Sequence, residues 1–421
     1  MTVPIQCGVT YRTRAAMYDK FDEGDWMWPM IYDNENRGRA WEPAPQMQAS
    51  QHSPQPDSQQ DPQHSPQPDS PQAPQHSPQP DSPQDPRQAA AMERRQRKQF
   101  SHVGLAAAAF MLLTLAAQVV VMVLVELLNS LLGDFIDFYG FSGRMLMSSL
   151  PMYLVAFPAV AGLLQLVPKC GAPQKEQWGF WKFASFFVIA VGIGLAGNIL
   201  GRLVGLLQPS GPDSAELDQL IRNSSLWVNL LTTVIMAPVV EELFFRKLVM
   251  DRLLGYGQKT AIIISGIMFG MAHGNFSQFF YAFGIGILWA YVYAKTGKVR
   301  YTIGFHMLFN LLGGVVTVEL SKGAQGLAEG PWMIRQIESI LGVDMGGLVT
   351  AFSSIMILAY LFFMLACLIA AITLIIMYRR QITFQPGQWP LRKGRAFQTA
   401  FLNVGMIVYF VICCGLFILN W

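Results

Sequence analysis

The sequence predicts an all-α polytopic membrane protein, a helical bundle preceded by a disordered N-terminal tail. Hydrophobic residues make up 52% of the 421 residues, and beyond residue 99 they gather in long runs with few charges. Runs of this length cross the ~30 Å hydrocarbon core of a bilayer as helices. Most of the chain before residue 99 is polar and rich in proline, so it lacks the apolar residues that a folded core requires.

The membrane part, residues 99–421, contains nine apolar runs. The first extends from about residue 103 to residue 132. The others lie near residues 147–167, 180–207, 226–250, 259–273, 277–294, 301–318, 348–377 and 398–420. The run at 259–273 is short for a bilayer crossing, so we expect its far end to lie inside the bundle. The bundle therefore has nine transmembrane helices, or eight if this run is re-entrant.

Basic residues beside these runs predict the orientation of the chain. Arg94, Arg95, Arg97 and Lys98 precede the first run. Loops on the same side as this group carry most of the remaining Lys and Arg residues, as cytoplasmic loops do. We therefore expect a multi-pass protein of the cell membrane with a cytoplasmic N-terminus and the lipid bilayer as its surroundings. The formal net charge of +3 is too small to indicate a nucleic-acid partner.

The N-terminal part divides into two segments. Residues 1–50 mix aromatic and charged side chains without a period, and we expect them to be disordered. Residues 51–98 form a tether with a basic flank, in which QHSPQPDS begins at Gln51, Gln63 and Gln75. Its prolines favour extended conformations, which predicts a semi-rigid linker. We interpret the histidines of the repeat as solvated linker residues, and a metal-binding tract is the alternative.

Two adjacent glutamates, Glu241 and Glu242, interrupt the apolar run at 226–250. A central charge costs roughly 2.5 to 3.5 kcal/mol in a membrane helix, so both carboxylates need partners. Arg246 follows Glu242 by four residues, on the same helix face, and Pro238 is expected to loosen the helix one turn earlier. Because adjacent residues point about 100° apart, we expect Glu242 to pair with Arg246 and Glu241 to remain available. The alternative is that both glutamates only fix helix packing.

Two histidines and an asparagine lie in later apolar runs. His273 is near the end of the run at 259–273, and His306 and Asn310 share one helix face at 301–318. A lone membrane histidine is more often a packing residue than a catalyst. Here, however, both histidines lie inside apolar runs and follow the glutamate pair by fewer than seventy residues. We therefore interpret these residues as part of one functional site.

Together these residues match the requirements for hydrolysis of an amide. A glutamate and a histidine from two helices can hold and deprotonate water, and a second histidine with an asparagine can stabilise the oxyanion. No serine or cysteine in these segments is placed to act as a nucleophile, and there is no HExxH helix. A zinc-assisted version stays open, with Glu241, His273 and His306 as ligands and water in the fourth position.

The three segments resemble a known family. EELFFR at 241–246, FGMAH at 269–273 and HMLFN at 306–310 are similar to the motifs EExxxR, FxxxH and HxxxN of the CAAX protease and bacteriocin-processing (Abi) family. The resemblance covers roughly residues 225–318. It implies an all-helical membrane endopeptidase, labelled a metalloprotease in many members, although a metal-free glutamate mechanism is also credible.

The resemblance implies a role for each candidate residue, namely the role that the family assigns to the matching motif position. Glu241 and His273 would activate water, and His306 and Asn310 would stabilise the oxyanion. Glu242 and Arg246 would support the site. The implied substrate is either a prenylated CAAX protein or a peptide such as a bacteriocin precursor.

Two other classes of function compete with the protease. In an ion-coupled transporter, the buried Glu, His and Arg residues would form a proton relay or a substrate site. In a catalytically silent scaffold, the membrane domain would bind a partner and the tail would carry the function. The sequence shows no inverted repeat of the kind that favours a transporter, and the three complete motifs favour the enzyme.

Overall fold

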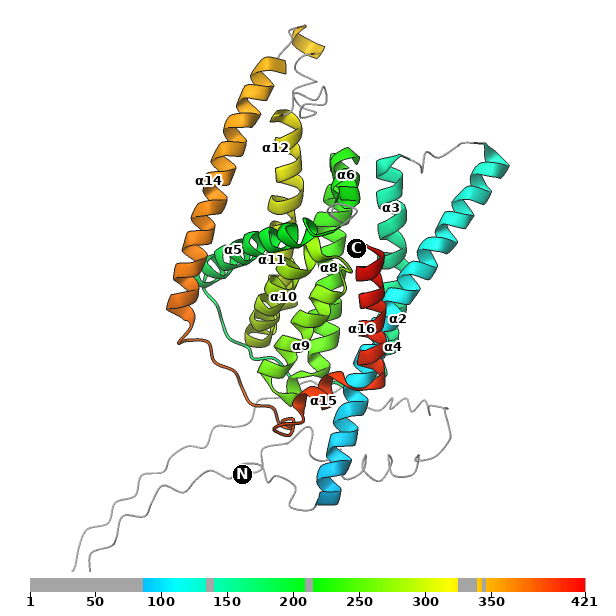
Figure 1. The fold of residues 1–421 in the computed structure, drawn as a ribbon, viewed down its shortest axis with the longest axis vertical. Helices are drawn as coiled ribbons and strands as arrows, with labels where there is room; N and C mark the ends of the chain where they lie inside the picture. The colour runs from blue at the N-terminus through cyan, green and yellow to red at the C-terminus, as the bar shows by residue number, and fades with distance from the viewer. Residues whose placement is uncertain (1–85, 134–139, 209–214, 325–338, 343–345, 421) are drawn as a thin grey trace, which may run out of the picture. The chain divides into compact units, whose positions relative to one another are not determined.

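The computed structural model describes residues 86–133, 140–208, 215–324, 339–342 and 346–420. Every regular element in these ranges is helical, so the predicted all-α membrane bundle is confirmed (Figure 1). The expectations for residues 1–50 and for the repeats of the tether fall outside the described residues. The basic flank of the tether is described, and it forms part of the first helix, which begins at Pro86.

In the following order, α marks an α-helix and η a short π or 3-10 segment. The elements are α2 (Pro86–Leu132), α3 (Phe141–Pro151), η1 (Met152–Ala156), α4 (Phe157–Gln165), α5 (Phe180–Gly205), α6 (Ala215–Asn223), α7 (Leu226–Asn229), η2 (Leu230–Met236), α8 (Ala237–Glu242), η3 (Leu243–Val249), η4 (Met250–Arg252), η5 (Leu254–Tyr256), α9 (Gln258–Met271), α10 (Phe276–Thr296), α11 (Val299–Asn310), η6 (Leu311–Val316), α12 (Thr317–Ala324), α14 (Gly346–Tyr378), α15 (Ala396–Phe401) and α16 (Val404–Leu419).

Seven helical stretches among the described residues are long and apolar enough to cross a membrane. They coincide with seven of the nine predicted runs, and the run that contains the glutamates becomes one continuous stretch, Leu226–Arg252. The two other runs form shorter helices, α9 with 14 residues and α16 with 16. In the turn that follows α9, the carbonyl of Gly274 accepts a hydrogen bond of 2.9 Å from Nδ2 of Asn420. This bond ties the end of α9 to the end of α16.

The stretch that carries the glutamates is not a uniform α-helix. Its middle part, α8, lies between two π segments, η2 and η3. At the end of η2, the amide of Ala237 donates to the carbonyl of Thr232, five residues earlier, and Pro238 has no amide hydrogen to donate. The loosening predicted one turn before Glu241 is therefore confirmed, as a widened turn. Such π segments are frequent at functional sites.

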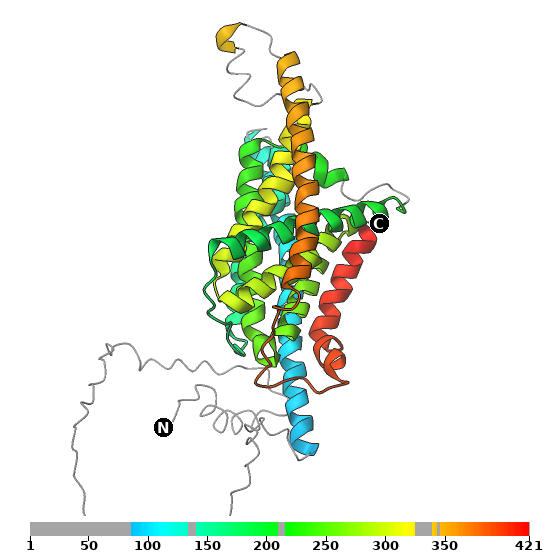
Figure 2. The ribbon, with the colours of Figure 1, turned by 90° about the vertical axis from the view of Figure 1, so that its left-hand side faces the viewer.

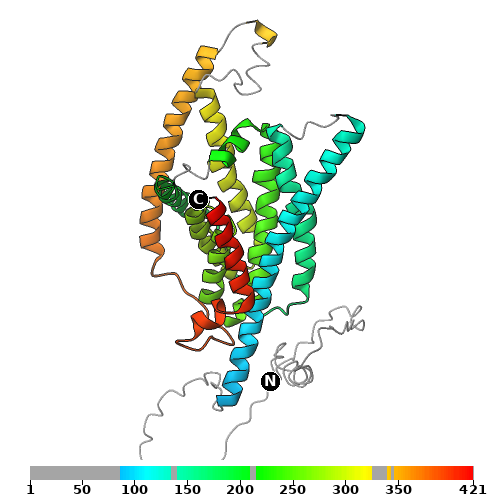
Figure 3. The ribbon, with the colours of Figure 1, turned by 45° about the vertical axis from the view of Figure 1, so that its right-hand side comes forward.

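Glycines set the closest helix contacts. A β-carbon on Gly197 or Gly201 of α5 would collide with the backbone of α10, and α5 runs steeply across the other helices (Figures 1 and 2). Gly405 of α16 lies against the backbone of α2 at Ser101, and these two helices run side by side (Figures 1 and 3). Small residues between membrane helices commonly allow the two backbones to approach this closely.

Loops close the end of the bundle near which α2 begins. The amide of Trp389 donates to the carbonyl of Gly255 at 3.0 Å, and the amide of Gly255 donates to the carbonyl of Cys170 at 2.7 Å. The side chain of Gln258 accepts a hydrogen bond of 3.0 Å from the amide of Gln385. These bonds join three loops that are far apart in the sequence, and so they fix the ends of the helices that lead to the glutamates and to His273.

Candidate active site

The charged centre of the bundle is the pair of Glu242 and Arg246, and both side chains are fully buried. Nη2 of Arg246 donates to Oε1 of Glu242 at 3.3 Å, while Nε lies 3.0 Å from Oε2 without hydrogen-bond alignment. Nη1 donates to Oγ of Ser265 at 3.0 Å, and the guanidinium lies over the ring of Phe269 at 4.7 Å. The predicted pairing is therefore present, and the buried arginine has partners on both α8 and α9.

His306 links the two glutamates. Its Nδ1 is 3.2 Å from Oε1 of Glu242, and its Nε2 is 3.9 Å from Oε2 of Glu241. The imidazole also packs against the indole of Trp289, with ring centroids 4.5 Å apart. Because an ionised carboxylate only accepts, Nδ1 carries the hydrogen, and Nε2 is the ring nitrogen that faces Glu241.

Glu241 is the more accessible of the two glutamates. Its side chain is 21% exposed, whereas that of Glu242 is fully buried. Oε2 of Glu241 accepts no hydrogen bond from any described residue. Oε2 is itself buried, and a buried polar atom without a partner is suited to accept a hydrogen bond from an enclosed water. The structure thus separates the adjacent glutamates into a paired and an unpaired group.

His273 lies just beyond the end of α9, where the chain turns toward α10. Its Nδ1 is 2.9 Å from the carbonyl of Phe269, so Nδ1 carries the hydrogen here as well. The turn depends on Gly274, whose φ of 65° is unfavourable for other residues. His273 is close enough to Glu241 and His306 to interact with both electrostatically. The structure therefore brings all three of these predicted residues into one region.

Asn310 sits at the end of α11, directly before the π segment η6. Its Nδ2 donates to the carbonyl of Thr233 in η2 at 2.9 Å. That carbonyl lacks a donor within its own helix, because the amide of Ala237 is bonded to Thr232 and residue 238 is a proline. Asn310 therefore stabilises the widened turn before Glu241, a contact that the sequence analysis did not anticipate.

Sequence reasoning also missed three residues of this region. Ser265 binds Arg246, Trp289 packs on His306, and the hydroxyl of Tyr153 donates to the carbonyl of Thr232 at 3.1 Å. None of the three belongs to a recognisable motif. A serine or an aromatic residue in an apolar run has an ordinary packing explanation, so no local signal distinguishes them.

The proposed metal ligands do not form a metal-binding group in the described part of the chain. No cluster of three or more His, Cys, Asp or Glu side chains is gathered there closely enough to hold an ion. The free Nε2 atoms of His273 and His306 are chemically suitable donors, since their Nδ1 atoms are held by oxygen as in many metal sites. The third donor, Glu241, does not complete a ligand set with them in this arrangement.

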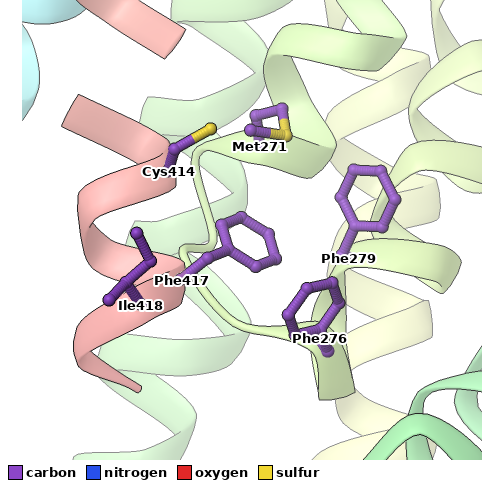
Figure 4. Close-up of a pocket in the computed structure, with 6 residues that line it drawn as sticks. All are labelled: Met271, Phe276, Phe279, Cys414, Phe417 and Ile418. Carbon is purple, nitrogen blue, oxygen red and sulfur yellow. The ribbon is translucent and has the colours of Figure 1, made fainter. Parts of the chain in front are cut away.

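An apolar cavity of about 400 Å³ lies near the turn that carries His273 (Figure 4). Side chains of α9, α10 and α16 line it, namely Met271, Phe276, Phe279, Cys414, Phe417 and Ile418. Met271 precedes His273 by two residues. The cavity could therefore take an apolar group that enters close to the cluster of polar residues.

A second charged cluster lies at the loop end of the bundle, where Glu176 of the loop after α4 meets the ends of two membrane stretches. Glu176 is 3.4 Å from Nζ of Lys295 and 3.5 Å from Nζ of Lys182, and Nε1 of Trp178 donates to it at 3.0 Å. Partial burial by itself raises the pKa of Glu176, but the hydrogen bond from Trp178 and the ammonium groups hold that pKa below its usual range. This cluster ties the loop after α4 to the end of α10.

The fold is that of a helical membrane protein, and Glu241, Glu242, His273 and His306 form one polar cluster inside it. Residues 223–312 match the family model described as "Type II CAAX prenyl endopeptidase Rce1-like". The resemblance predicted from the three motifs is thereby confirmed, and this segment is similar to CAAX-type membrane proteases.

Two curated proteins show the same relationship. The "Putative membrane peptidase YdiL" of Bacillus subtilis is 26% identical over 176 residues, which cover 40% of this chain and 70% of the relative. The "Membrane-embedded CAAX protease MroQ" of Staphylococcus aureus is 25% identical over 147 residues, or 33% of this chain and 58% of that protein. No solved structure matches the chain. Each of these similarities leaves more than half of the chain without a counterpart.

Proposed function

We propose that the protein is an intramembrane endopeptidase that hydrolyses a peptide bond with water activated by Glu241 and histidine. One observation carries this proposal: Glu241 has an unpaired oxygen that lies 3.9 Å from Nε2 of His306. This separation is too long for a direct hydrogen bond, and polar groups at such distances are commonly joined by water. Glu242 and Arg246 hold the other side of His306 in place.

The histidine tautomers support a proton path. In their neutral forms His306 and His273 both present the lone pair of Nε2, since the Nδ1 atoms of both donate to oxygen. Water can therefore donate one hydrogen to Glu241 and the other to an imidazole. When the water attacks the carbonyl carbon, its proton passes to this pair, and the same proton later goes to the amine that leaves.

The oxyanion that forms in this attack needs hydrogen-bond donors. Asn310 uses one amide hydrogen to hold Thr233, and its second amide hydrogen is assigned to the oxyanion. A histidine that has accepted a proton supplies a further donor at Nε2. This assignment keeps the family roles of His306 and Asn310 and adds His306 to water activation, because its Nε2 faces Glu241.

The substrate is assigned to peptides or proteins at the membrane, of CAAX type or of the peptide-processing type. The apolar cavity near His273 supports a substrate that carries an apolar group, such as a prenyl chain. We assign the N-terminus to the cytoplasm, because basic residues are enriched in cytoplasmic loops and the loops on the side of Arg94, Arg95, Arg97 and Lys98 carry most of the remaining Lys and Arg residues.

The test compares wild type with Glu241→Gln in nanodiscs, using fluorogenic peptides with a prenylated CAAX end, the same end without the prenyl group, and an unrelated apolar sequence. Cleavage by wild type alone supports the proposal, and the preferred peptide gives the substrate class. Uptake of peptide into sealed vesicles without cleavage would instead indicate a transporter, and neither activity would indicate a scaffold. Repeating the assay after chelator treatment tests the metal requirement.

A further inference from the structure

Two consecutive carbonyls of the π segment η2 accept hydrogen bonds from side chains of other helices. Asn310 of α11 donates to Thr233, and Tyr153 of η1 donates to Thr232. Tyr153 is buried, with 7% of its surface exposed. It lies outside residues 223–312, the segment that matches the protease family.

These two bonds matter because both carbonyls belong to the irregular hydrogen-bond pattern of η2. The carbonyl of Thr233 has no donor in its own helix, and that of Thr232 accepts the displaced amide of Ala237. A widened turn lacks the regular ladder that fixes the rotation of an ordinary helix. Hydrogen bonds from side chains of other helices must therefore fix the rotation of this turn.

The turn directly precedes the catalytic glutamate of the proposed function. Glu241 follows Ala237 by four residues, about one helical turn. The hydroxyl of Tyr153 is near enough to Glu241 for the two groups to interact electrostatically. A change in the rotation of the widened turn would swing the carboxylate of Glu241 away from Nε2 of His306.

We propose that Tyr153 is a positioning residue, whose hydroxyl bond to Thr232 fixes the widened turn and so directs Glu241 toward His306. This inference rests on the proposed function, because it concerns the geometry of the same reaction. It differs from a purely structural role in its consequence. Loss of the hydroxyl should affect the chemical step more than it affects stability or substrate binding.

Tyr153→Phe removes only the hydroxyl, and Tyr360→Phe is its matched control. Tyr360 of α14 also donates to the carbonyl of a π segment, that of Leu312 in η6, at 3.0 Å. Both changes should lower the melting temperature by similar small amounts. Tyr153→Phe should reduce kcat about tenfold, the equivalent of one lost hydrogen bond, with KM within about twofold of wild type. Tyr360→Phe should leave both constants near wild type.

Equal kcat values for the two variants would overturn the inference while leaving the proposed function intact. A wild-type protein that cleaves no peptide would overturn the proposed function itself. Hydrogen exchange gives a readout that does not depend on activity. The peptide around Ala237 should exchange faster in Tyr153→Phe than in Tyr360→Phe, and unchanged exchange there would also contradict the role of Tyr153.

Discussion

Two membrane stretches of this protein differ in what surrounds them. In Leu226–Arg252, 44% of the most apolar window is buried inside the protein, whereas in Thr350–Tyr378 only 11% is buried. The first stretch contains both glutamates and Arg246, and the second contains no charged residue. A charge in contact with lipid is costly, so charges are tolerated where other helices supply partners. The charged groups of the proposed site therefore lie in one of the two most enclosed stretches, Leu226–Arg252, and not in the most apolar one.

The largest effect is expected from removing the unpaired carboxylate of the enclosed stretch. Glu241→Gln should reduce hydrolysis at least about 100-fold, because it removes the general base of the proposed mechanism. His273→Ala and His306→Ala should have effects of the same order. The measurement is kcat/KM in nanodiscs, with thermal melts to show that each variant is folded. Full activity in a folded variant would remove that residue from the mechanism.

The second prediction concerns the buried ion pair. Arg246→Ala should strand Glu242 without its cation and cost roughly 3 to 5 kcal/mol of stability. Combining it with Glu242→Gln should restore part of the loss, because the stranded charge is then absent. Arg379→Ala, at the exposed end of α14, is the control and should be nearly neutral. Thermal melts in detergent compare wild type with Arg246→Ala, Glu242→Gln, the double variant and Arg379→Ala, and strictly additive losses would mean that the two side chains do not interact.

A third prediction compares two glycines of the C-terminal helix α16. Gly405→Ala should destabilise by roughly 1 to 3 kcal/mol, because its new methyl group would collide with the carbonyl of Ser101 in α2. Gly415→Ala should be neutral or slightly stabilising, since no atom lies within 4 Å of the position that its new β-carbon would take. Melting temperatures measure both variants. Similar values for the two would show that the close approach of α2 and α16 is not required.

The smallest effect is expected at the loop end of the bundle. The pKa of Glu176 is lowered in the folded protein, so its contribution is present above the unfolded pKa and is lost as pH falls through the folded value. The melting temperature should therefore decrease below about pH 4.3, the ordinary value for Glu. In Glu176→Gln, part of this decrease should be absent. Because the carboxylate is partly exposed, the difference should be at most about 1 kcal/mol. An identical pH dependence in both proteins would contradict this role.

The features that depend on local spacing can be predicted from the order of the amino acids alone. Apolar runs gave the membrane helices, the four-residue interval placed Arg246 beside Glu242, and Pro238 predicted the loosened turn. These follow from helix periodicity and from the missing amide of proline, which act within one or two turns. The motifs around His273 and His306 indicated the family for the same reason, because they are short and ordered along the chain.

Tertiary structure decided which atoms of the site meet. That Nε2 of His306 faces Glu241, that Asn310 is bonded to Thr233, and that Tyr153 reaches Thr232 depend on contacts between residues 65 to 79 positions apart. Such contacts are set by the tilt and rotation of whole helices, which follow from packing at glycines and aromatic rings throughout the bundle. A local pattern shows which face of a helix is polar. It does not show toward which neighbouring helix that face points, because packing between the helices fixes that direction.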